Sequence, residues 1–172
     1  MPRLDFDTAA TDGPVADRIR ARRGGRLTEL DRMLLHSPPL ADGWNSLLDA
    51  VRTRSSLPAD VRELVILRIA ALNGADYEWR SHEPVGRRAG LGDADLAALR
   101  PGAPTGALTA ARRAALAYAD AMTRDVSVAP EVFEALREHF DDRGIVELTL
   151  TIGTYNLVSR FLVALQIGDD AP

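Results

Sequence analysis

Three side chains that can exchange protons interrupt two apolar segments of this chain. Glu63 lies in the most apolar stretch of the first half, and Glu78 and His82 follow it, four residues apart. Residues four apart lie on one face of a helix, so Glu78 and His82 are expected to point the same way. An ionised group taken out of water must be paired or its pKa shifts, so such positions are candidates for proton transfer.

Two carboxylates and an imidazole around one cleft would suit general acid and base catalysis. A carboxyl group near a second carboxylate or in a dry pocket has a raised pKa, and histidine already titrates near neutrality. Proton transfer at a carbon next to a carbonyl, or decarboxylation through an enolate, could use these groups without a cofactor. The alternative is a structural role, in which Glu78 and His82 are an ordinary packing or surface pair on one helix and Glu63 is bound to a nearby arginine.

Metal binding is a third, weaker interpretation. Glu63, Asp76, Glu78 and His82 could supply ligands, but the Glu-x-x-His spacing of helical di-iron sites does not occur around them. We therefore predict no metal and no cofactor.

Four further residues are candidates for substrate binding. Tyr77 and Trp79 flank the second glutamate and could line a pocket, although core packing or a subunit contact is the more common role of such a tryptophan. Tyr155 and Arg160 interrupt the apolar final segment. Arg160 could bind a substrate carboxylate through its guanidinium, or pair with Glu147 or a neighbouring subunit.

Apolar spacing predicts the two helices that would position the proton-exchanging trio. Val61 and the apolar residues after it recur at offsets of three and four, which predicts a helix from Pro58 that is buried nearly all round and ends at Asn73 and Gly74. Asp76 is expected to cap a second helix, which runs toward Gly90 and is kinked or interrupted after His82 by Pro84. A hairpin of these two helices can bring Glu63 near His82.

The rest of the chain is also predicted to be helical. No segment alternates with period two, so we expect an all-α bundle, with an irregular arm and a short helix over 1–26 and one helical domain over 27–172. The other expected helices cover 15–23, 27–35, 40–53, 93–99, 109–122 and 130–139, with a last long one that starts at 141 or 142.

Composition excludes several classes of function. The chain has no cysteine, which removes disulfides, thiolate nucleophiles and cysteine-ligated metals. Its 21 basic residues are dispersed among 25 acidic ones, so a nucleic-acid surface is not indicated. The polar N-terminus does not resemble a secretory signal, which predicts a cytoplasmic location. The apolar segment 145–165 contains Glu147, Asn156 and Arg160 and is interpreted as a buried or interface helix rather than a membrane span.

Several of these motifs resemble the carboxymuconolactone decarboxylase family. The similarity covers roughly residues 30 to 167. It is carried by the segment from Leu57 to Arg68, by Ala71 to Gly74, by Tyr77, Glu78, Trp79 and His82, by Arg87 to Leu91, and by the late run from Val146 to Asn156.

The resemblance also shows what this chain has lost. Members that resemble alkylhydroperoxidase D carry a glutamate, two cysteines and a histidine in a fixed frame. Here Glu63 and His82 stand at the ends of that frame, and Ala75 and Glu78 stand where the cysteines would be. Disulfide-forming peroxide reduction needs both thiols, so we predict no peroxidase activity.

The resemblance implies a helical bundle of the alkylhydroperoxidase D-like type, assembled as a homotrimer or homohexamer. It further implies a cofactor-free lyase or isomerase that acts on a small carboxylate or carbonyl compound, with Glu63, Glu78 and His82 as catalytic residues. A non-catalytic oligomer that binds a small molecule or serves a structural role is the alternative.

Overall fold

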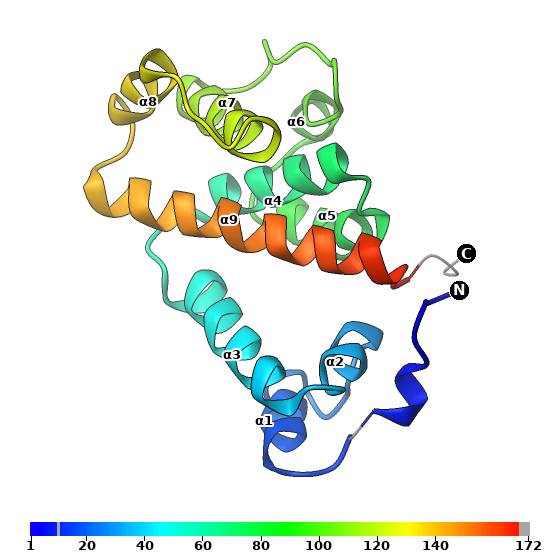
Figure 1. The fold of residues 1–172 in the computed structure, drawn as a ribbon. Coiled ribbons are helices and arrows are strands. Elements are labelled where there is room, and N and C mark those ends of the chain that lie inside the picture. Colours follow the sequence, from blue (N-terminus) through cyan, green and yellow to red (C-terminus); the bar gives the residue numbers. More distant parts are fainter. Residues whose placement is uncertain (10, 169–172) are drawn as a thin grey trace. The chain divides into compact units, whose positions relative to one another are not determined.

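All regular structure in residues 1–9 and 11–168, the part that the computed structural model describes, is helical (Figure 1). This confirms the predicted all-α class. The chain divides into two compact units, of which one comprises Met1–Arg54 and the chain from Ala164, and the other Ser55–Val163. Every candidate site residue lies in the second unit. The boundary that we placed after residue 26 stays a prediction.

Three short helices form most of the first unit. A capping box at Thr28 begins the second of them, because the Thr28 hydroxyl and the Asp31 carboxylate each accept a hydrogen bond from the other residue's backbone N–H. The helical segments are η1 (Phe6–Thr8), α1 (Pro14–Arg22), α2 (Glu29–Leu34), α3 (Pro38–Asp49) and the π-helical turn η2 (Ala50–Arg54).

The central helix of the second unit is α4 (Ala59–Asn73). Its residues 63–70 are all buried, as the apolar spacing predicted. Gly74 ends the helix with a left-handed φ of 66° and donates its backbone N–H to the carbonyl of Ala70. This conformation suits glycine, which lacks the Cβ that would clash there.

Helix α5 (Asp76–Arg88) follows after a single turn and differs from the prediction in two ways. The expected interruption at Pro84 was wrong, because the helix continues through it. Proline removes one backbone donor, and the carbonyl that this donor would reach belongs to Arg80, an exposed residue where water can take its place. Asp76 is not the N-cap but the first helical residue. Its negative charge there interacts favourably with the positive end of the helix dipole.

Gly86 lets the two helices of this hairpin approach closely. A Cβ at this position would lie 3.1 Å from side-chain carbons of Leu67 and Leu91 and 3.6 Å from the Cβ of Glu63. The missing side chain therefore helps to bring α5 against the face of α4 that carries Glu63.

Four more helices complete the second unit. The Thr109 hydroxyl accepts the backbone N–H of Arg112, which confirms the predicted cap of α7. Helix α9 is joined to α7 by the hydroxyls of Tyr118 and Thr149, 2.9 Å apart, and to the end of α4 by Asn73 Nδ2 and Ser159 Oγ, 2.6 Å apart. The four helices are α6 (Asp93–Ala98), α7 (Ala110–Arg124), α8 (Pro130–Arg137) and α9 (Asp142–Leu165), the long helix that crosses the centre of Figure 1.

Ion pairs connect α7 to α4 and α6. The buried guanidinium of Arg68 on α4 makes two hydrogen bonds of 2.6 Å to the Asp120 carboxylate and a third, of 3.0 Å, to the carbonyl of Leu99. Arg112 at the start of α7 pairs with Asp60 and with Asp95, at 2.9 and 3.0 Å. These contacts fix the helices that surround α4.

Helix α9 is long and apolar enough to cross a membrane by length and composition alone. Half of its most apolar window is buried inside the structure. The interpretation of this segment as a buried or interface helix therefore agrees with its packing.

Glu147 on α9 gives the fold a pH-dependent contact. Burial opposes its ionisation, but hydrogen bonds from Ser56 and Arg143 outweigh burial and hold the pKa of Glu147 below its ordinary value of 4.5. A carboxylate whose folded pKa is lowered stabilises the folded chain above its unfolded pKa, and this stabilisation is lost as the pH falls through the folded pKa.

We therefore expect Glu147→Gln to lower the free energy of unfolding at pH 7 and to lose this effect in acid. Urea unfolding of both proteins between pH 7 and pH 3.5 measures the difference. A difference that stays constant over this range would contradict the assignment.

Candidate active site

The site is built around a buried contact between the two helices of the hairpin. Glu63 Oε2 on α4 lies 2.7 Å from His82 Nδ1 on α5. The Glu63 side chain is 3% exposed and that of His82 is 11% exposed. An ionised Glu63 can only accept, so in a neutral imidazole Nδ1 carries the proton and Nε2 keeps its lone pair. The hairpin thus holds a largely buried imidazole through its Nδ1.

Tyr155 on α9 closes the other side of the imidazole. Its hydroxyl lies 3.4 Å from His82 Nε2, and the two rings meet edge to face with centroids 5.2 Å apart. Tyr155 is fully buried. The structure therefore brings together one residue from each of α4, α5 and α9. We predicted Tyr155 as a substrate-binding residue, and the structure places its hydroxyl at the histidine.

Glu78 is the other predicted acid, and the structure buries it. It lies one helical turn before His82 on α5 and is 2% exposed. Both residues thus belong to the inner side of α5, as the spacing of four residues predicted.

Glu63 also contacts a nearby arginine, as the packing alternative in the sequence analysis allowed, but the sequence did not single out Arg62. Its Nε lies 3.4 Å from Glu63 Oε1, and its side chain is 15% exposed. Consecutive residues on a helix point about 100° apart, so a contact between them is not expected from spacing. The available signal was a basic residue next to the one acid in the buried part of an apolar helix.

Trp79 is buried and contacts two charged side chains. Its indole N–H donates to Glu83 Oε2 at 2.8 Å, and the guanidinium carbon of Arg100 lies 3.6 Å from its ring centroid. The hydrogen bonds from Trp79 and from Arg87 hold the pKa of Glu83 below its ordinary value. This favours the packing role for Trp79 over the substrate-binding one. Tyr77, two residues earlier, is half-buried.

Arg160 belongs to a separate polar cluster. Its guanidinium donates to the carbonyl and the side-chain oxygen of Asn156, and to the carbonyl of Thr123 at 3.5 Å. Glu147, the partner that we considered for Arg160, binds Ser56 and Arg143 instead. The structure thus does not join Arg160 to the Glu63 and His82 contact.

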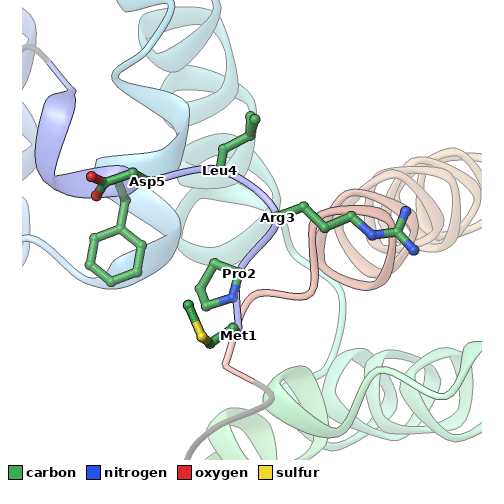
Figure 2. Close-up of a pocket in the computed structure, with 6 residues that line it drawn as sticks. Met1, Pro2, Arg3, Leu4 and Asp5 are labelled. Carbon is green, nitrogen blue, oxygen red and sulfur yellow. The ribbon is translucent and has the colours of Figure 1, made fainter.

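Two other regions of the described chain do not form a competing site. Within the described ranges 1–9 and 11–168, no group of three or more His, Asp or Glu side chains could hold a metal ion. A surface pocket of about 340 Å³ is lined by residues 1–6 of the first unit. Figure 2 shows that the charged side chains of Arg3 and Asp5 in this pocket point away from each other, so they do not form a convergent set.

Comparison with known proteins supports the resemblance. The model of the carboxymuconolactone decarboxylase family matches residues 38–121. An AhpD-like protein of unknown function from Agrobacterium tumefaciens is 27% identical, with a TM-score of 0.71 over 76% of this chain and 90% of that one. Proteins with a curated function yield no match.

More distant structures share the fold. A peroxidase-related protein from Silicibacter sp. TM1040 is 20% identical, with a TM-score of 0.79 over 96% of this chain and 90% of its own. The debrominase Bmp8, solved with 2,3,4-tribromopyrrole, is 19% identical, with a TM-score of 0.77 over 99% of this chain and 91% of its own.

The hairpin that carries Glu63 and His82 lies inside the matched residues, and the solved relatives have the same helical architecture. This cysteine-free chain therefore matches the carboxymuconolactone decarboxylase family over residues 38–121 and has an AhpD-like fold.

Proposed function

We propose that this protein is a cofactor-free lyase or isomerase that acts on a small carboxylate or carbonyl compound by general acid and base catalysis. The observation that carries the proposal is the buried 2.7 Å contact between Glu63 and His82, with the far ring nitrogen at a hydroxyl. A carboxylate that orients an imidazole in this way is a common arrangement for a general base.

In the proposed reaction, His82 Nε2 removes a proton from a carbon next to a carbonyl group. Glu63 holds the ring through Nδ1 and stabilises the imidazolium that forms. Glu78, buried one turn away, exchanges a proton with His82 or with the product. An isomerase would return this proton to a different carbon. A lyase would skip the removal step: the bond to the substrate carboxylate breaks, carbon dioxide leaves, and protonated His82 or Glu78 gives the remaining carbanion a proton that the side chain takes back from water. Tyr77 and Tyr155 are the proposed substrate contacts, whereas the roles of Trp79 and Arg160 in binding stay predictions.

Peroxide reduction through a disulfide is not proposed, although a solved relative is peroxidase-related. The chain has no cysteine, so neither the attacking nor the resolving thiol exists.

The test is a turnover screen of the purified protein with small lactones, β-keto acids and hydroxy acids, followed by mass spectrometry. We expect loss of carbon dioxide or isomerisation for at least one compound, with a rate that depends on a group titrating near neutrality. If the parent protein turns over no compound but binds a small acid near His82, the non-catalytic binding function replaces the catalytic one.

We further propose that the protein is a homotrimer or homohexamer in the cytoplasm and that α9 forms a subunit contact. Val146, Leu150 and Leu157 are each about half exposed or more, and their spacing places them on one face of the helix.

The double variant Leu150→Glu and Leu157→Glu is expected to dissociate the oligomer, because it places charges in an apolar contact. Light scattering coupled to size exclusion gives the mass. Leu40→Glu, which alters an exposed leucine on α3, is the control and should keep the parent's mass. A monomeric parent protein would contradict the proposal.

A further inference from the structure

Glu63 has two oxygens, and the structure gives each of them a different basic partner. Oε2 meets His82 Nδ1 at 2.7 Å, and Oε1 meets Arg62 Nε at 3.4 Å. The guanidinium is almost as well covered as the imidazole, with side-chain exposures of 15% and 11%. Arg62 thus places a permanent positive charge beside the Glu63 carboxylate, which orients the histidine.

We propose that Arg62 is a positioning residue that limits the basicity of His82 through Glu63. This inference rests on the proposed function, in which His82 must gain and lose a proton within one turnover. A carboxylate alone beside an imidazole favours the charged form, and a strongly favoured imidazolium would be a poor base at neutral pH. A guanidinium on the same carboxylate opposes that effect.

The contact also fixes where Glu63 points. A glutamate that accepts from one partner can rotate about its terminal bonds, whereas one that accepts at both oxygens is held on two sides. Arg62 therefore orients the Glu63 carboxylate and also opposes the build-up of positive charge on the His82 imidazole.

The other charged and titratable groups around this contact leave Arg62 as the cation to test. Glu78 lies on the same helix as His82, and Tyr155 faces the imidazole from α9. Two other arginines between α4 and its neighbours already form ion pairs with carboxylates. These pairs are Arg68 with Asp120, and Arg112 with Asp60 and Asp95.

The test is an NMR titration of His82 in the parent protein, in Arg62→Gln and in Arg62→Lys. The chain has three histidines, and the loss of one resonance in His82→Asn identifies the signal. We expect Arg62→Gln to raise the pKa of His82 by about one unit, because it removes the nearby positive charge. Arg62→Lys keeps the charge and should restore most of the parent value.

Arg124→Gln removes an arginine of the same unit that is half exposed on α7, and should leave the titration of His82 unchanged. The acid limb of the kcat/KM profile should move upward with the NMR pKa in Arg62→Gln. An unchanged or lower His82 pKa in Arg62→Gln, or an equal shift in Arg62→Lys, would overturn the role of Arg62. The titration does not need turnover, so an inactive parent protein would defeat the proposed function without deciding this inference.

Discussion

His82→Asn is expected to reduce kcat/KM by roughly 10²- to 10⁴-fold, the usual contribution of a general acid or base. The asparagine amide can still donate to Glu63 from about the position of Nδ1, but it has no group that accepts a proton near neutral pH. The fold should therefore persist while the chemistry is lost. Turnover of the compound found in the screen is the measurement, and circular dichroism with thermal unfolding checks the fold.

Two variants sharpen this experiment. His82→Ala removes the donor as well, leaves Glu63 with Arg62 alone, and should cost about 1–3 kcal/mol of stability in addition to the activity. Tyr155→Phe keeps the buried ring and removes only the hydroxyl, so it isolates the contact at Nε2. If His82→Asn kept the parent's rate, the imidazole would not be the base, and the contact with Glu63 would have to be a packing feature.

The order of helices could be predicted from the sequence because each helix has local signals for its start, its apolar face or its end. Apolar spacing gave α4, the pair Asn73 and Gly74 gave its end, and Thr109 gave the start of α7. The predicted interruption at Pro84 failed for a tertiary reason, because a helix tolerates a proline when the carbonyl four residues earlier can reach water. Whether that carbonyl is buried depends on the tertiary structure, which the spacing of residues along the sequence does not show.

The site was predictable only as far as the hairpin determines it. One tight turn between two helices was enough to expect Glu63 near His82. The hydroxyl of Tyr155 comes from a helix more than 70 residues later, so its place at Nε2 depends on tertiary packing. The same limit applies to Arg160, where Asn156 and the end of α7 decide the orientation of the guanidinium, and to Trp79, which Arg100 covers from another part of the chain.

Asp120→Ala should be the most destabilising of the substitutions considered, with a loss of about 3 kcal/mol in the free energy of unfolding. It leaves the buried guanidinium of Arg68, whose side chain is 7% exposed, without its carboxylate. Removal of one partner of a buried pair costs about 3–5 kcal/mol, and the partial exposure of Asp120 places this case at the lower end. Urea unfolding measures the loss, which corresponds to a fall of roughly 6–12 °C in Tm.

A matched control separates burial from ion pairing as such. Arg18 and Asp42 form a pair of the same 2.6 Å length, but both side chains are about half exposed. Asp42→Ala should therefore cost less than about 1 kcal/mol. The double variant Arg68→Met and Asp120→Leu should recover much of the loss, because it removes the buried charge together with its partner. Equal losses in Asp42→Ala and Asp120→Ala would show that the desolvated guanidinium of Arg68 is not what makes this contact important.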